Sequence, residues 1–228
     1  MIYKRLRRKK GRLFAVGDLH GCYDEFNEKL KEVGFKKSED TMLSVGDLAD
    51  RGKDNIKCME LAQKKWFHPV FGNHEDLAMK SFWNDWFSKQ TWIMEQNGGG
   101  WYDELPEEDK DYAKELIENT VNYPVVIEAH FKGKKIIVCH SDYPYDEYEF
   151  NKGRGEYDDT YYAIWDRNRI HSSIRGKTKR IDGADLFIFG HTPIKSNEPL
   201  LFENQLYIDT SAVLEDGVLT IVNVEDYL

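Results

Sequence analysis

The chain has 228 residues, of which 40% are hydrophobic and 32% are charged. This length is enough for one domain with a full core, and the hydrophobic fraction argues against disorder of the whole chain. The net charge of −9 argues against a protein that holds nucleic acid on a broad basic face.

Seven lysines and arginines are concentrated in residues 4 to 12. The rest of the chain carries 25 basic and 41 acidic residues, a net charge of −16. Because lysine and arginine discourage unwanted pairing at a sheet edge, we expect a solvated edge strand or hairpin here. A tether for nucleic acid or another acidic partner is the alternative.

The first half of the chain alternates apolar segments with helical patterns. Residues 13–16 and 42–45 are typical of buried strands, and a short strand is expected around residues 70–71. Helical spacing runs from residue 23 to 33, and again from 56 to about 65. This βαβαβ order predicts parallel strands joined by right-handed crossovers.

Residues 75–119 show helical and aromatic character without a strand pattern, so we predict a helical insertion there. One of its helices should open after Pro106, because proline and the carboxylates that follow it suit a first helical turn. Aromatic side chains at this density are expected to belong mainly to the core.

The second half of the chain favours antiparallel pairing. Residues 125–127 and 136–138 flank a hairpin signal at Lys132-Gly133-Lys134. Further strands are expected at residues 186–189, 201–202, 206–208 and 219–222. No linker or repeat divides the chain, so we expect a single domain over residues 1–228, with an α/β architecture in which helices flank a central β-sandwich of mixed sheets.

The three cysteines, Cys22, Cys58 and Cys139, form no CxxC pair and are too few for a disulfide framework. No apolar stretch approaches about 18 residues, and the basic amino terminus lacks the apolar segment of a signal peptide. We therefore expect a cytoplasmic protein without a membrane partner.

Four glycine-bracketed polar clusters follow apolar runs, at residues 17–21, 46–52, 72–75 and 190–192. They place Asp, His and Asn at the ends of predicted strands, where open α/β sheets carry their ligand sites. These side chains ligate hard or borderline divalent metals. Together the clusters indicate a two-metal phosphoester site.

Each fragment has a simpler explanation when it stands alone. An isolated Asp-x-His is more often a surface turn, Gly-Asn-His-Glu is explained by helix capping, and His140 alone is more often a core histidine. On an extended strand end Asp18 and His20 would both reach one cation, whereas the adjacent Asn73 and His74 would point apart. Because ordinary turns do not need His and Asp together, the ordered set favours a metal site.

In these clusters the chain resembles the metallophosphoesterases of the phosphoprotein phosphatase family, most closely its bacteriophage lambda-type members. The resemblance covers nearly the whole chain and implies the metallophosphoesterase fold and a bacterial or phage-infected cytoplasm. Beyond the clusters it rests on residues 97–101, 140–144, 146–150, 164–167 and 207–210.

The resemblance implies a role for each matched residue. Two divalent metal ions would be held by Asp18, His20, Asp47, Asn73, His140 and His191. Asp47 would bridge them, His74 would be a general acid oriented by Asp50, and Arg51 and Arg167 would grip the phosphate. Mn²⁺ is expected, with Fe²⁺, Zn²⁺ or Ni²⁺ as alternatives, since the ligands are oxygen and imidazole without thiolate.

Two positions are left open by the resemblance. Arg169 lies so near Arg167 that only the motif match distinguishes them. Where the lambda-type members continue Asp-Thr-Gly-Ala, this chain has Ser211 in place of the glycine, so we expect an altered backbone near the site and a changed fit to substrate.

The implied activity is that of a Mn²⁺-dependent phosphatase acting on phosphoproteins or phosphopeptides. The phosphoresidue would be serine or threonine, with tyrosine and histidine as further candidates, and a metal-bridging hydroxide would attack directly. The alternative is a hydrolase similar to the symmetrical diadenosine tetraphosphatases, with Trp83, Trp86, Trp92 or Trp101 stacking an adenine. A non-catalytic metal-binding module is a third hypothesis and a nuclease a weaker one; the sequence indicates no oligomeric state.

Overall fold

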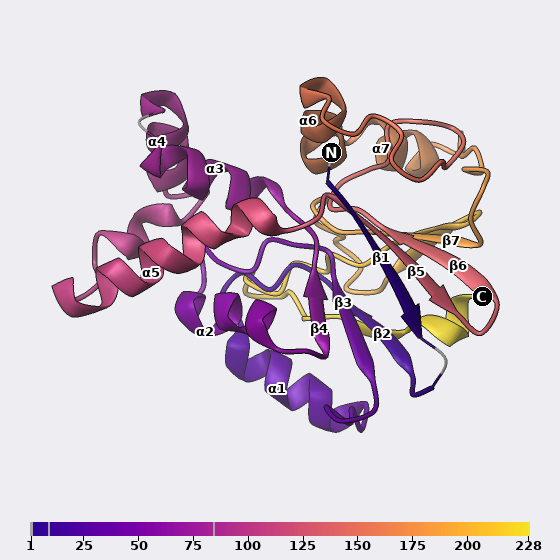
Figure 1. Cartoon of the computed structure of the whole chain (residues 1–228), viewed down its shortest axis with the longest axis horizontal. Coiled ribbons are helices and arrows are strands. Elements are labelled where there is room, and N and C mark those ends of the chain that lie inside the picture. The colour runs from indigo at the N-terminus through magenta and orange to yellow at the C-terminus, as the bar shows by residue number, and fades with distance from the viewer. Residues whose placement is uncertain (1, 9, 84) are drawn as a thin grey trace.

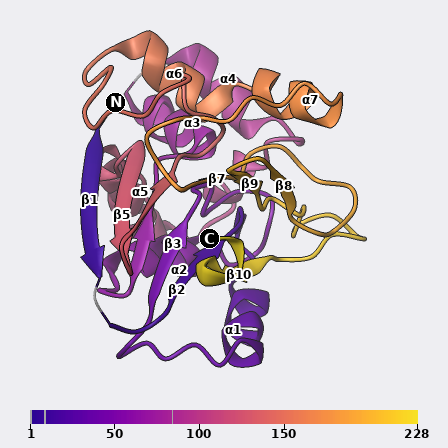
Figure 2. The same cartoon turned by 90° about the vertical axis from the view of Figure 1, so that its right-hand side faces the viewer.

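The computed structural model describes residues 2–8, 10–83 and 85–228. It is a mixed α/β fold in which two mixed sheets pack face to face between outer helices (Figures 1 and 2). The strands are β1 (Tyr3–Arg8), β2 (Leu13–Val16), β3 (Thr41–Ser44), β4 (Phe67–Pro69), β5 (Val126–Phe131), β6 (Lys134–Val138), β7 (Leu186–Phe189), β8 (Leu200–Phe202), β9 (Gln205–Tyr207) and β10 (Ile221–Asn223). The predicted architecture of a β-sandwich flanked by helices is confirmed.

The helices lie outside the two sheets. They are α1 (Tyr23–Glu32), α2 (Asn55–Glu60), α3 (Asn73–Phe82), α4 (Trp86–Ile93), α5 (Glu107–Asn119), α6 (Tyr157–Trp165) and α7 (Asn168–Ile174). Helices α1 and α2 pack against the four-stranded sheet, and α6 and α7 against the six-stranded one. A third apolar cluster, which includes Val45 and Ile188, fills the space between the sheets.

The four-stranded sheet has the order β10-β2-β3-β4. Strands β2, β3 and β4 are parallel, as the βαβαβ pattern predicts. The third of these strands, β4, lies three residues earlier than expected and ends at Pro69. Because β4 is an edge strand, a backbone nitrogen that faces outward has no partner in the sheet, and proline, which lacks an N–H, is tolerated there. The helix predicted up to residue 65 ends at Glu60 and continues as a short 3₁₀ segment.

The six-stranded sheet has the order β1-β5-β6-β7-β9-β8. Its β5–β6 hairpin turns at Lys132 and Gly133, whose φ angles of 48° and 81° are those that a tight two-residue hairpin turn needs. Helices α6 and α7 were not predicted. The exposed aromatic side chains of Tyr157 and Tyr161 interrupt the apolar periodicity by which α6 would have been recognised.

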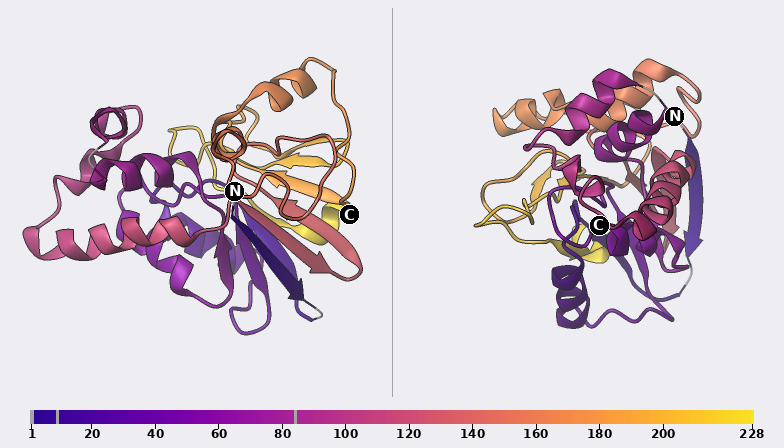
Figure 3. Two further views of the ribbon diagram at one scale, coloured as in Figure 1. Left: turned by 45° about the horizontal axis from the view of Figure 1, so that its top comes forward. Right: turned by 90° about the vertical axis from the view of Figure 1, so that its left-hand side faces the viewer.

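The helical character predicted for residues 75–119 is confirmed by α3, α4 and α5, with α5 opening after Pro106. These helices extend away from the sheets (Figure 3). The expected burial of the aromatic side chains is wrong for Trp83, Trp86 and Phe87, which are 56%, 72% and 73% exposed. Trp86 and Phe87 lie in the first turn of α4, which packs mainly on α3 and leaves these two side chains in solvent, and Trp83 directly follows the end of α3.

The basic tract forms an edge strand, as predicted: β1 is the outermost strand of the larger sheet and runs parallel to β5 (Figure 2). Arg5 forms an ion pair with the buried Glu128 on β5. Glu128 also accepts hydrogen bonds from His130 at 2.6 Å and from the Tyr148 hydroxyl at 2.9 Å. Burial raises the pKa of Glu128, but these three donors outweigh it and hold the pKa below its ordinary value.

We expect Glu128→Gln to lower the free energy of unfolding by about 1–3 kcal/mol at pH 7, since three donors lose a charged acceptor. Because the pKa of Glu128 is lower in the folded than in the unfolded state, its charge stabilises the folded state at pH values above the unfolded pKa of about 4.3. This stabilisation is lost as the pH falls through the folded-state pKa. Urea unfolding at pH 7 and pH 3.5 should therefore give a smaller difference at the lower pH. The exposed Glu215→Gln is the control; an equal difference at both pH values contradicts the assignment.

The three cysteines are free, in agreement with the absence of a disulfide framework. No helix within the described residues is both long and apolar enough to cross a membrane.

Candidate active site

The four polar clusters meet at one end of the sandwich, beyond the carboxyl ends of strands from both sheets. The segment after β2 supplies Asp18 and His20, and the segment after β3 supplies Asp47. Helix α3 begins with the third cluster, and β6 and β7 are followed by His140 and His191. Seven candidate side chains of these segments are each 5% exposed or less: Asp18, His20, Asp47, Asn73, His74, His140 and His191.

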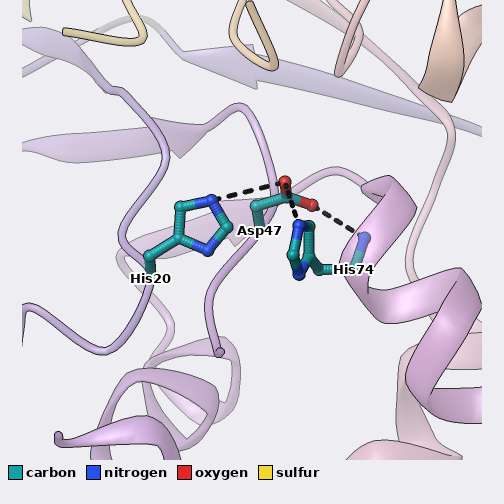
Figure 4. Close-up of side chains that lie close together, drawn as sticks. All are labelled: His20, Asp47 and His74. Atoms are coloured by element: carbon teal, nitrogen blue, oxygen red, sulfur yellow. Dashed lines mark hydrogen bonds and ion pairs between the residues drawn. The ribbon is translucent and has the colours of Figure 1, made fainter. Parts of the chain in front are cut away.

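A first group of possible ligand atoms comes from His20, Asp47 and His74 (Figure 4). Oδ2 of Asp47 lies 3.7 Å from Nε2 of His20 and 3.9 Å from Nε2 of His74. Nδ1 of His20 is 2.9 Å from the carbonyl oxygen of Ala49. Because a carbonyl only accepts, Nδ1 carries the hydrogen, and Nε2 keeps its lone pair toward Asp47.

A second group comes from Asp47, His140 and His191. The backbone again fixes the tautomers: Nδ1 of His140 is 2.6 Å from the carbonyl of Val45, and Nε2 of His191 is 3.1 Å from the carbonyl of Trp165. The opposite ring nitrogen of each histidine therefore carries the lone pair in the neutral form. His140 is buried and hydrogen-bonded, as a core histidine would be, and it also offers a ligand atom to the second group.

Oδ1 of Asn73 joins the three ligand atoms of this second group. Oδ1 of Asn73 lies 2.8 Å from both Nε2 of His140 and Nδ1 of His191, and Nε2 of His140 is 3.4 Å from Oδ2 of Asp47. Lone pairs that face one another at this range need a cation or a proton between them. Burial lowers the pKa of His140, but Asp47 more than offsets it and raises that pKa to about 10, so a cation would compete with a proton here. These residues fit a divalent metal.

The carboxylate of Asp18 accepts the backbone N–H of His191 at 3.0 and 3.2 Å, whereas the ring of His20 contacts the carbonyl of Ala49. His20 has a φ of 41°, so the extended geometry by which the sequence placed both side chains on one side is wrong. Burial, followed by the nearby charge of Asp209, raises the pKa of Asp18 well above its ordinary value. Buried carboxylates gathered in this way favour bound cations.

Two residues at the site received no role from the sequence. Asp209 follows β9, and its position at a strand end was the one signal that could have indicated it. Glu75 accepts backbone N–H groups of Gly72, Asp47 and Leu48 at 2.8–2.9 Å. It thereby fixes the loop that carries Asp47 to the start of α3.

His74 lies between Asp50 and Arg51. Its Nδ1 is 2.7 Å from Oδ2 of Asp50, and its Nε2 is 3.0 Å from Nη2 of Arg51. Burial lowers the pKa of His74, but the carboxylates of Asp47 and Asp50 more than offset it and raise the pKa. Nη1 of Arg51 is 2.6 Å from Nε2 of His20, so a cation on His20 requires this exposed guanidinium to turn away.

Asn73 and His74 diverge as expected, but for a different reason. Both lie in the first turn of α3 and not on a strand end. Successive residues of a helix point about 100° apart, which sends Asn73 to the second group and His74 to Asp50.

Arg167 and Arg169, which the sequence did not separate, have different surroundings. Nε of Arg169 donates to Asp142 at 2.8 Å, and its Nη2 donates to the carbonyl of Tyr143 at 3.2 Å. Arg167 is exposed and has its Nη2 3.5 Å from the carbonyl of His191. Arg167 is therefore available at the rim of the site, while Arg169 is committed to a buried carboxylate.

We expect Arg167→Ala to lower kcat/KM by about 10²-fold with little change in the unfolding free energy, because the resemblance implies that this arginine holds phosphate and because its one long contact, to the carbonyl of His191, is 3.5 Å. Arg169→Ala should instead lower the unfolding free energy by about 3–5 kcal/mol, because it leaves the buried Asp142 unpaired. Urea unfolding and steady-state kinetics of both variants test the pair. A reversed pattern would mean that the two arginines exchange roles.

The backbone at Ser211 adopts a conformation that few residues other than glycine take. Ser211 has a φ of 64°, within the left-handed region that glycine adopts easily. Its N–H donates to Oδ1 of Asp209 at 2.9 Å.

Comparisons with known proteins agree with this geometry. Residues 11–207 match the family model of the calcineurin-like phosphoesterases. The chain is 37% identical to serine/threonine-protein phosphatase 2 of Salmonella typhimurium over 88% of this chain and 87% of that protein. It is 28% identical to an asymmetrical bis(5′-nucleosyl)-tetraphosphatase, PrpE, of Bacillus cereus over 90% and 87%. A crystal structure described as a putative diadenosine tetraphosphatase has the same fold, with a TM-score of 0.62, 18% identity and 97% of each chain covered.

The protein belongs to the calcineurin-like metallophosphoesterases, and its relatives include serine/threonine phosphatases of the phosphoprotein phosphatase family. It is a hydrolase of the phosphoesterase class, and the family implies divalent metal ions.

Proposed function

We propose that this protein is a metal-dependent phosphoprotein phosphatase that hydrolyses phosphoserine and phosphothreonine. The observation that carries the proposal is the arrangement of His74, with Nδ1 on Asp50 and Nε2 directed at Arg51 beside the shared Asp47. This arrangement suits proton delivery to a leaving alkoxide next to a metal pair. The 37% identity to a protein named serine/threonine-protein phosphatase 2 supports the choice of substrate.

The proposed ligands are Asp18, His20 and Asp47 for one metal and Asp47, Asn73, His140 and His191 for the other, with Asp47 shared. The ions, when bound, supply Lewis acidity that activates water and neutralises phosphoryl charge. Mn²⁺ is proposed because the donors are oxygen and imidazole, which suit Mn²⁺ and Fe²⁺ and leave Zn²⁺ and Ni²⁺ possible. A single domain in the cytoplasm and kinship to the lambda-type members complete the proposal.

The side chains divide the remaining work. Arg51 and Arg167 hold the phosphoryl oxygens, a task for which the fork of a guanidinium is better suited than an ammonium. His74, protonated at Nε2, donates to the leaving oxygen, while Asp50 keeps the proton on Nδ1 and fixes the ring. Phosphotyrosine and phosphohistidine are further candidate substrates, because proton donation also serves a phenoxide or an imidazole leaving group.

The proposal is tested with purified protein, p-nitrophenyl phosphate and phosphoserine and phosphothreonine peptides. Each is assayed with Mn²⁺, Mg²⁺, Zn²⁺, Ni²⁺ or a chelator. We expect phosphate release that depends on added metal and is abolished by the chelator. A metal-loaded protein that releases no phosphate from any of these compounds would instead support the non-catalytic hypothesis.

A dinucleoside polyphosphate hydrolase is the second candidate, favoured by the similarity to the asymmetrical tetraphosphatase PrpE. The sequence favoured the symmetrical class, which differs in its products. Trp92 is 3% exposed and is therefore not free to stack an adenine, whereas Trp83 and Trp86 are exposed. Turnover of diadenosine tetraphosphate against a phosphopeptide separates the candidates, and product analysis separates AMP plus ATP from two ADP.

A further inference from the structure

We infer that Trp92 and Trp101 are positioning residues for His74, acting through Asp50. This inference rests on the proposed function, in which His74 protonates the leaving group. Neither indole reaches the metal ligands in a described contact; both reach the carboxylate behind His74.

The two indoles bind the same carboxylate. Nε1 of Trp92 lies 3.0 Å from Oδ1 and 2.9 Å from Oδ2 of Asp50, and Nε1 of Trp101 lies 2.8 Å from Oδ1. Oδ2 also meets Nδ1 of His74 at 2.7 Å. Asp50 is 1% exposed, so these groups and not water satisfy its charge.

The direction of these hydrogen bonds follows from the chemistry of indole. An indole N–H only donates, so both oxygens of Asp50 act as acceptors toward Trp92 and Trp101. The remaining contact, with His74, is then filled by a hydrogen on Nδ1. The reactive nitrogen of His74 is consequently Nε2, which faces Arg51 and the first group of ligand atoms.

The helices outside the sandwich bring the indoles to this position. Trp92 is in α4 and is 3% exposed, and Trp101 is in the 3₁₀ segment Gly99–Tyr102. Their rings pack edge to face, with centroids 6.4 Å apart. The region that departs from the two sheets thus contributes directly to the orientation of the proposed acid.

The glycines before Trp101 allow this close approach. A Cβ atom on Gly98, which has a φ of 74°, would lie 2.5 Å from the backbone nitrogen of Arg51, and one on Gly99 would lie 2.5 Å from the ring of Trp92. Gly98 is therefore explained by packing against the loop that carries Asp50, and Gly99 by packing against Trp92.

The test replaces each indole with a ring that cannot donate, as Trp92→Phe and Trp101→Phe. Each variant is assayed on phenyl phosphate, whose leaving group needs protonation, and on p-nitrophenyl phosphate, whose leaving group needs little. We expect kcat on phenyl phosphate to fall about 10-fold, part of the 10²–10⁴-fold effect of a general acid. The fall on p-nitrophenyl phosphate should be smaller, and KM should not change. Trp66→Phe, which alters packing against Phe26 and Phe35, is the matched control.

A double-mutant cycle with His74→Asn decides whether the indoles act through His74. In the His74→Asn background, Trp101→Phe should have no further effect on kcat. An equal fall on both substrates, or an undiminished effect in that background, overturns the inference and indicates a general structural role. If the unmodified protein hydrolyses neither compound with any metal, the proposed function itself has failed.

Discussion

Asp47→Asn is expected to lower turnover of p-nitrophenyl phosphate by about 10³-fold or more and to reduce bound metal below two ions per chain. Oδ2 of Asp47 lies within 3.4–3.9 Å of three imidazole nitrogens and belongs to both groups of ligand atoms. Losing its charge removes several kcal/mol of charge stabilisation, and each 1.36 kcal/mol is tenfold in rate. Elemental analysis of metal content alongside kcat measures both effects.

Asparagine is a suitable replacement because its Oδ1 can still accept the N–H of His74, which Asp47 accepts at 3.0 Å. Asp24→Asn, in an exposed ion pair with Lys53, is the control for a lost surface carboxylate. An Asp47→Asn protein that keeps two ions and full turnover would show that this carboxylate is not shared between metals.

His74→Asn is expected to lower kcat by about 10²–10⁴-fold while KM and metal content stay unchanged. The reason is that its Nδ1 is committed to Asp50 at 2.7 Å, so in the proposed role Nε2 is the nitrogen that delivers a proton to the leaving group. The effect should be largest for phenyl phosphate and phosphoserine peptides, and smallest for p-nitrophenyl phosphate. Steady-state kinetics on the three substrates, with metal analysis of the same samples, give the result.

Metal content also distinguishes this role from another that the geometry permits. His74 forms part of the first group of ligand atoms, with His20 and Asp47. If His74 were a metal ligand, His74→Asn would lose an ion, and its activity would fall on all substrates alike. His74→Gln provides a second variant of similar polarity with a longer side chain.

The fold could be predicted where local patterns are strong. Parallel β2, β3 and β4 follow from continuous apolar runs, and the β5–β6 hairpin follows from Lys132-Gly133. Helix α6 could not be predicted, because Tyr157 and Tyr161 face solvent, and exposed aromatic residues break an amphipathic pattern. Trp86 was expected in the core but is exposed, because the composition of this region does not tell which helices lack a covering layer.

The site could be predicted further in residue identity than in geometry. The clusters indicated the ligand-type side chains, and the structure brings them together as two groups: His20, Asp47 and His74, and Asp47, His140 and His191. The extended-strand argument for Asp18 and His20 failed, since the positive φ of His20 depends on tertiary contacts. The engagement of Trp92 and Trp101 with Asp50 joins segments that are more than 40 residues apart, and no local pattern encodes such a contact.

The second group of ligand atoms straddles the two halves of the sandwich, because Asp47 follows β3 of one sheet and His140 and His191 follow strands of the other. An ion bound there would be coordinated by residues from both sheets and would hold the sheets together. Metal binding and the packing of the two sheets would then be linked. Each tenfold rise in free metal above its dissociation constant would add about 1.4 kcal/mol to the free energy of separating the sheets. Storage in a chelating buffer would therefore weaken the packing of the two sheets as well as remove activity.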